Sequence, residues 1–170
     1  SEYIHDFYVP AARQGQRLSA DHYAGARALA RWKTRIRRAW PRVSLRRLGD
    51  PAHQIRYGER LSFEVVAELN GLEPEDVVVE ALVSRRHGAN EAITGVIDGR
   101  GRLPEGGSDR RRPYDARAQF TVLEKLDGGG THYILEYEPE WCGRLSYQVR
   151  LYPYHELLTH PFELGLMVWL

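Results

Sequence analysis

The chain has 170 residues, of which 42% are hydrophobic and 28% charged, so it is long and apolar enough to bury a core of its own. Its formal net charge of +1 argues against a partner such as DNA that is attracted by overall charge. A single cysteine, Cys142, excludes an internal disulfide and suits the cytoplasm, and neither a bilayer-spanning apolar run nor a signal peptide is present.

The first 42 residues have the apolar spacing of helices. Pro10 should kink or end a first helix, and Gly15 should follow as a break. Ser19 is a suitable N-cap for a second helix, which ends at Pro41. Arginines occupy one side of this second helix, and its other side carries an apolar stripe of Leu29, Trp32, Ile36 and Trp40. Such a stripe requires a large surface to pack against.

After Val43 the apolar period changes from 3.6 residues to 2. Alternating or β-branched runs occupy residues 44–48, 61–69, 77–83, 92–97, 118–126, 133–137, 145–151 and 165–169. A polar stretch between Asp98 and Arg117 predicts a mobile loop. The sequence therefore predicts a mainly β fold: an immunoglobulin-like two-sheet β-sandwich preceded by two α-helices, with a boundary between residues 1–42 and 43–170.

None of the common catalytic patterns is present in the sequence. The glycines lie between expected strands, not in a phosphate-binding loop, and no serine lies in a nucleophile elbow. His155 and His160 lack a third metal ligand by spacing and are interpreted as local hydrogen-bonding groups. Glu64 and Glu68 are interpreted as the solvent face of a strand. We therefore predict no catalytic residue, no cofactor-binding residue and no metal ligand in this chain.

Two further surfaces were candidates for binding. The basic segment 27–47 is interpreted as a solvated helix face, and not as a nucleic-acid site, because its aromatic residues belong to the apolar stripe. Aromatic residues also cluster between Tyr133 and Tyr154. Trp141, between Pro139 and Gly143, is the candidate glycan contact of this cluster, since an exposed aromatic ring can stack on a sugar. The alternative is that Trp141 plugs the end of the sandwich.

The two ends of the chain resemble a known family. Residues 2–12 contain Glu-Tyr-Ile and Phe-Tyr-Val-Pro-Ala-Ala, residues 32–43 begin with Trp-Lys, and residues 152–169 begin with Tyr-Pro-Tyr-His-Glu-Leu-Leu. Together they are similar to the extreme C-terminal region of bacterial and archaeal α-glucan phosphorylases of the shorter-core subfamily. Residues 72–77 share only the general pattern of that region.

The resemblance implies a parent glycosyltransferase that cleaves α-1,4-glucan with phosphate to release glucose 1-phosphate. Such enzymes hold pyridoxal phosphate on a lysine of an upstream catalytic core. That signature is absent here, because Lys33 and Lys125 stand in unrelated contexts. The resemblance thus implies that residues 1–42 end the core and that residues 43–170 form a non-catalytic accessory domain, with the upstream core as partner.

Two alternatives to the accessory-domain interpretation remain open. The sandwich could be an independent carbohydrate-binding module that recognises α-glucan. It could also be a purely structural interaction module that packs on the core or forms a homodimer. An open reading frame that extends several hundred residues upstream would separate the accessory domain from a free-standing module.

Overall fold

A computed structural model describes residues 9–49, 58–85, 115–140 and 143–170 of the chain. One long helix is followed by eight strands and two short 3-10 turns. In chain order the elements are α1 (Val9–Ala39), η2 (Trp40–Arg42), β1 (Ser44–Leu48), β2 (Leu61–Glu68), η3 (Pro74–Asp76), β3 (Val77–Arg85), β4 (Ala116–Gln119), β5 (Thr121–Lys125), β6 (Gly130–Tyr137), β7 (Leu145–Pro153) and β8 (Val168–Trp169).

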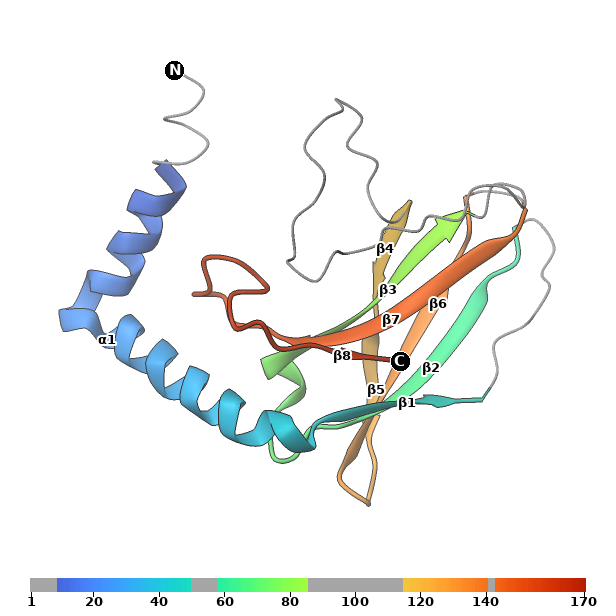
Figure 1. Cartoon of the computed structure of the whole chain (residues 1–170), viewed down its shortest axis with the longest axis horizontal. Coiled ribbons are helices and arrows are strands. Elements are labelled where there is room, and N and C mark those ends of the chain that lie inside the picture. Colours follow the sequence, from blue (N-terminus) through green and yellow to red (C-terminus); the bar gives the residue numbers. More distant parts are fainter. Residues whose placement is uncertain (1–8, 50–57, 86–114, 141–142) are drawn as a thin grey trace, which may run out of the picture.

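The strands form two antiparallel sheets, with the strand orders β1-β2-β6-β5 and β4-β3-β7-β8. Lettered in chain order, these are the orders A-B-E-D and C′-C-F-G that characterise immunoglobulin-like sandwiches. Figure 1 shows the two sheets as layers, with α1 running along one end of the sandwich and then away from it. The predicted fold class is confirmed.

The alternation of the strands explains how the core forms. Successive side chains of a strand point to opposite faces, so every second residue of each strand enters the space between the sheets. Val65 of β2, Val79 of β3 and Leu151 of β7 are among the most buried side chains, with exposed fractions of 1%, 1% and 0%. Apolar residues that recur at every second position are therefore what holds the two sheets together.

The strand predicted over residues 118–126 is in fact two strands in different sheets. β4 pairs with β3, whereas β5 pairs with β6. Phe120 lies between them, buried, and its backbone N–H donates to the carbonyl oxygen of Val79 at 2.9 Å. Because the apolar alternation continues through Phe120, the sequence shows no sign that the chain crosses between the sheets there. The predicted strand at residues 92–97 and residues 98–114 of the predicted loop lie outside the described residues.

Where the sequence predicts two helices, the structure has one helical element that bends. Neither Pro10 nor Gly15 interrupts α1 within its described bounds. The bend lies at His22 and Tyr23, whose φ angles of 54° and 64° are left-handed, and Figure 1 shows the helix axis turning in this part. Nη1 of Arg27 donates to the carbonyl oxygen of His22 at 2.5 Å, so it satisfies a backbone acceptor at the bend.

None of the helices among the described residues is long and apolar enough to cross a membrane.

Candidate functional site

The second half of α1 is part of the hydrophobic core of the sandwich. Trp32 and Trp40 are 6% and 8% exposed, and Ile36 is fully buried. One continuous cluster of buried residues joins this stripe to inward-facing residues of both sheets. Burying an aromatic side chain of this size removes a large apolar area from water. The helix is therefore fixed to the sandwich and is not a loose lead-in.

Asp76 of η3 fastens the helix through polar contacts. Its Oδ1 accepts hydrogen bonds from Nε1 of Trp32 and from Nη2 of Arg35, both at 2.7 Å. Its Oδ2 accepts from the backbone N–H of Glu73 at 2.9 Å, and its carbonyl oxygen accepts from the N–H of Tyr154 at 2.8 Å. The buried carboxylate therefore joins the helix to the loop before β3, and the backbone of the same residue joins both to the loop after β7.

Further contacts hold α1 at points along its length. The rings of Trp32 and His155 lie with centroids 5.0 Å apart, and Lys33 forms an ion pair with Glu163 of the same C-terminal loop. At the end of the helix, Nδ2 of Asn70 donates to the carbonyl oxygen of Ala39 at 2.9 Å, which satisfies one of the carbonyls left free there. These contacts hold the second half of the helix on the sandwich.

The two late histidines form the local hydrogen bonds predicted for them. Nδ1 of His155 accepts from the backbone N–H of Leu157, and Nδ1 of His160 accepts from the N–H of Phe162, both at 3.1 Å. In the part of the chain that the structure describes, no group of three or more His, Cys, Asp or Glu side chains is placed to hold a metal ion.

Glu64 does not pair with another carboxylate but with a histidine that the sequence did not single out. His132 of β6 is 6% exposed, and its Nε2 lies 2.9 Å from Oε2 of Glu64. Its Nδ1 lies 3.6 Å from Oε1 of Glu124 on β5. His132 is next to Tyr133 on β6, and Tyr133 belongs to the core cluster between the sheets. Because successive side chains of a strand point to opposite faces, His132 lies on the outer face of its sheet. The contact follows from the pairing of β2 with β6, and the sequence does not specify that pairing.

The two lysines of the chain do not fit a pyridoxal phosphate site. Lys33 is paired with Glu163, and Nζ of the exposed Lys125 lies 2.7 Å from Oε2 of Glu73. The hydrogen bond that Lys125 donates to Glu73, together with the negative charge of that carboxylate, raises the pKa of Lys125, whereas a lysine that forms a Schiff base requires a lowered pKa. Both lysines are thus surface ion-pair residues.

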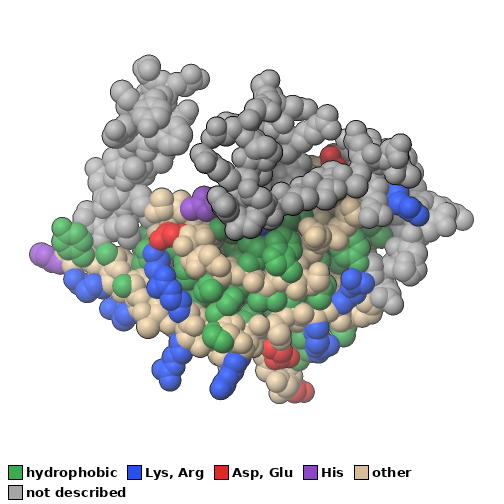
Figure 2. Space-filling model, viewed as in Figure 1, with side chains coloured by type: hydrophobic (Ala, Val, Ile, Leu, Met, Phe, Trp, Pro, Cys, Tyr) green, Lys and Arg blue, Asp and Glu red, His purple; other side chains and the backbone are tan. Residues whose placement is uncertain are grey.

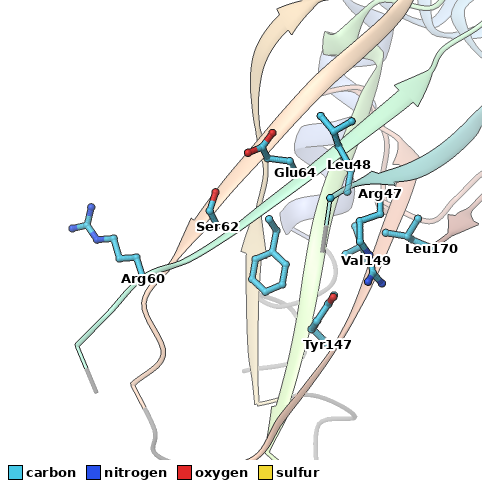
Figure 3. A pocket seen from close by; sticks show the side chains of 11 residues that line it. Arg47, Leu48, Arg60, Ser62, Glu64, Tyr147, Val149 and Leu170 are labelled. Carbon is cyan, nitrogen blue, oxygen red and sulfur yellow. The ribbon is translucent and has the colours of Figure 1, made fainter. Parts of the chain in front are cut away.

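An opening of about 400 Å³ lies where β1 meets the end of the chain. Its lining combines apolar residues with Arg47, whose guanidinium lies 5.7 Å from the ring centre of Tyr147. In Figure 3, Arg47, Tyr147, Val149 and Leu170 gather on one side of the opening, whereas the side chain of Arg60 points away from it. The opening exposes part of the inter-sheet core at this edge of the sandwich.

A charged pair is buried on the outer face of the β4-β3-β7-β8 sheet. Nε of Arg150 donates to Oε1 of Glu80 at 2.6 Å, and these side chains are only 10% and 4% exposed. The Arg150 guanidinium also lies 4.7 Å from the ring centre of Phe162, 5.5 Å from that of Tyr152 and 5.6 Å from that of Trp169. The apolar alternation of β3 and β7 predicts that Glu80 and Arg150 face solvent, so the sequence did not indicate a buried ion pair there.

Beside this pair lies a groove of about 680 Å³, larger in volume than the opening at β1. β4 contributes the exposed residues Arg117 and Gln119, and the loop after β7 contributes Tyr154, which is 44% exposed. Glu80 forms part of the groove, and Nε of Arg117 lies 3.5 Å from its Oε2. The groove therefore presents an aromatic ring, hydrogen-bond donors and hydrogen-bond acceptors together.

The side of α1 that faces away from the core is strongly basic. Residues 22–49 contain eight arginines and one lysine but no acidic residue. We call five of them the arginine stripe. Four belong to α1 and fall within an arc of about 80° at 100° per residue, and the fifth is in η2, directly after the helix: Arg27, Arg31, Arg35, Arg38 and Arg42. Figure 2 shows Lys and Arg side chains projecting along the edge that α1 occupies, while hydrophobic side chains gather over the middle of the molecule.

Few of the described acidic side chains lie near the arginine stripe. Arg35 is paired with Asp76, but the described part of the chain provides no ion-pair partner for Arg31, Arg38 or Arg42. Like charges spaced four residues apart destabilise a helix by a few tenths of a kcal/mol per pair, roughly. The stripe thus reduces the stability of the isolated helix.

The aromatic residues of the late cluster have different positions. Tyr147 is half-buried, and its ring centre lies 4.7 Å from that of Phe63 in the core. Tyr133 is buried, and its hydroxyl has no hydrogen-bond partner among the described groups. Trp141, the candidate glycan contact, and Cys142 lie outside the described residues. The exposed aromatic residues that the structure does describe in this region include Tyr154 and Trp169.

Comparison with known proteins connects this architecture to a family. The model of the glycogen phosphorylase C-terminal domain matches residues 108–170. The maltodextrin phosphorylase of Thermococcus litoralis is 30% identical over 99% of this chain, and the glycogen phosphorylase of Mycobacterium tuberculosis is 25% identical over 98% of it. The chain spans only 17% of the length of each relative. No solved structure matches it significantly. The resemblance seen at the two ends of the sequence is therefore confirmed: this chain is similar, along nearly its whole length, to the C-terminal region of bacterial and archaeal α-glucan phosphorylases.

Proposed function

We propose that this chain is the non-catalytic C-terminal accessory domain of an α-glucan phosphorylase. The parent enzyme would cleave α-1,4-glucan with phosphate in an upstream core that carries pyridoxal phosphate. Within the chain, residues 1–42 would reach that core and residues 43–170 would form the accessory sandwich. The similarity to two phosphorylases of which the chain spans 17% supports this division of labour.

The observation that carries the proposal is the single hydrophobic cluster that α1 shares with the sandwich. The second half of the helix is buried in this cluster, while the half beyond the bend at His22 and Tyr23 runs away from the sheets (Figure 1). A helix that is anchored in one body and extends away from it can join that body to another. We infer that α1 would connect the sandwich to the core in this way.

The arginine stripe is the surface that we infer to contact the upstream core. Its uncompensated charge favours an acidic partner, since complementary charge gives an interface specificity and fast association. A nucleic-acid partner would use exposed aromatic residues between the basic ones. Trp32 and Trp40, the aromatic residues of this segment, are instead buried against the sandwich. An acidic surface of the same polypeptide thus agrees best with the stripe.

Phosphorolysis tests the catalytic part of this proposal. The isolated chain should release no glucose 1-phosphate from maltodextrin and phosphate and should show no cofactor absorbance band after purification. The full-length parent should release glucose 1-phosphate and should show the cofactor band. Turnover by the isolated chain would contradict the proposal.

Charge reversal in the full-length protein tests the docking surface. Changing Arg31, Arg38 and Arg42 to Glu should increase cleavage by a protease between core and sandwich, because the interface would carry like charges. A control that changes Arg46, Arg60 and Arg144 to Glu makes the same change of net charge on the sandwich and should leave cleavage unchanged. Equal cleavage of the two variants would exclude the stripe as the contact.

A further inference from the structure

We propose that the groove on the outer face of the β4-β3-β7-β8 sheet binds a neutral oligosaccharide. The assignment of α-glucan as the oligosaccharide rests on the proposed function, whereas the preference for a neutral sugar rests on the groove itself. Four residues carry the site: Tyr154, Arg117, Gln119 and Glu75. The site differs from Trp141, which the sequence suggested.

Tyr154 supplies the apolar surface that a sugar ring needs. Its side chain is 44% exposed, and its backbone is held by the hydrogen bond from its N–H to the carbonyl oxygen of Asp76. A partly exposed tyrosine on a fixed backbone offers a flat face on which the C–H groups of a sugar can stack. Pro161 and Val78 extend the apolar wall beside it.

Arg117 and Gln119 supply polar groups in a regular array. They are two residues apart on β4, so their side chains share the outer face, and the register places Gln119 opposite Glu80. A guanidinium presents parallel N–H donors, and a carboxamide presents a donor beside an acceptor, so both planar groups suit the adjacent hydroxyls of a sugar. The amide oxygen of Gln119 and the exposed carboxylate of Glu75 add acceptors.

The charges of the groove favour a neutral ligand over an anion. Arg117 and Glu75 bring one charge of each sign to the groove, while the carboxylate of Glu80 is paired with Arg150. The groove therefore has no excess positive charge to attract a phosphate or an acidic peptide, while a polyol requires the mixture of donors and acceptors that is present.

The buried pair of Glu80 and Arg150 gives the groove a fixed floor. Taking two charges out of water is costly, and an apolar pair of similar volume is often as stable or more stable. The pair is 4% and 10% exposed on the outer face of a sheet. Because Glu80 accepts from Arg150 while its other oxygen faces Arg117, it restricts where the Arg117 guanidinium lies. This pre-organisation reduces the entropy that ligand binding must overcome.

A titration of the chain with maltoheptaose, followed by amide NMR shifts, tests the site. Shifts should cluster on residues 117–119 and 152–154, with a dissociation constant of about 0.1–10 mM, as expected for a shallow site. Tyr154→Ala and Gln119→Ala should each weaken binding at least about fivefold, whereas Tyr154→Phe should retain it. Tyr23→Ala, which removes a tyrosine 62% exposed on α1, is the matched control and should have no effect.

Different outcomes separate this inference from the proposed function. A flat titration, or shifts that cluster at Trp141 and survive Tyr154→Ala, would overturn the groove as the site. Equal binding of cellohexaose would overturn the assignment to α-glucan. None of these results would affect the accessory role, because that role is tested by phosphorolysis with the full-length enzyme and with the isolated chain.

Discussion

Nε1 of Trp32 donates a hydrogen bond to Oδ1 of Asp76 at 2.7 Å, within the contact between α1 and the sandwich. The two residues are 44 positions apart in the sequence, and both are buried. The indole thus contributes its apolar body to the core and its polar N–H to the only buried carboxylate on η3. This combination fixes the helix both in position and in rotation about its axis.

Replacing Trp32 should separate the apolar from the polar contribution. Trp32→Ala removes a large buried side chain and should lower the free energy of unfolding by about 3–5 kcal/mol. Trp32→Phe keeps most of the apolar area but removes the N–H that donates to Oδ1 of Asp76. The loss of unfolding free energy should therefore be smaller, about 1–3 kcal/mol. Chemical denaturation followed by circular dichroism measures both values. Tyr23→Ala, at an exposed position on the same helix, is the control.

Equal losses for Trp32→Ala and Trp32→Phe would mean that the hydrogen bond, and not the apolar area, fixes the helix. No loss in either variant would mean that the helix is not held by this contact.

Removing the hydroxyl of Tyr133 should stabilise the fold or leave it unchanged. This hydroxyl is buried without a hydrogen-bond partner among the described groups, which costs about 1–3 kcal/mol of desolvation. Burial and, to a smaller extent, the charge of Glu75 raise the pKa of Tyr133, so the neutral form persists in the folded state. Tyr133→Phe should therefore raise the unfolding free energy by up to about 1–2 kcal/mol. Thermal and chemical denaturation would detect this change, and Tyr23→Phe should have no effect. A clear destabilisation would reveal a partner for the hydroxyl, such as a bound water.

The ion pair between Lys33 and Glu163 should make the stability of the fold depend on pH in acid. The hydrogen bond from Lys33 lowers the pKa of Glu163 from 4.5; partial burial opposes this shift, and the backbone N–H of Thr159 supports it. A carboxyl whose pKa is lower in the folded state stabilises the fold at pH values above its ordinary pKa. That stabilisation is lost as the pH falls through the lowered value.

The comparison of wild type with Glu163→Gln between pH 7 and pH 3 measures this effect. The difference in unfolding free energy should be constant near pH 7, at about 0.2–1 kcal/mol because the pair is partly exposed, and should shrink below pH 4.5. A difference that is independent of pH would show that the variant acts through packing and not through the charge of Glu163.

The sequence alone was sufficient for the fold class, the apolar helix stripe and the family resemblance. A strand that buries one face has apolar residues at every second position, and this pattern can be read from a short segment. Residues 145–151 are an example. The stripe of Leu29, Trp32, Ile36 and Trp40 is likewise buried as its spacing predicts. The turn at residues 127–129 agrees with its glycines, because Gly129 has a φ of 94°, which other residues rarely adopt.

Only the tertiary structure decided which distant residues meet. The crossing of the chain between sheets at Phe120 keeps the apolar period, so nothing in the local pattern marks it. The bend of α1 lies at His22 and Tyr23 and not at Gly15, and a bulky residue such as Tyr23 rarely adopts a left-handed φ, so local propensity does not mark the bend. The groove at Tyr154 and the ion pair of Glu80 with Arg150 join residues from strands whose pairing is long-range. Such pairs depend on strand register and on how the layers stack, and these are properties of the whole fold and not of any one segment.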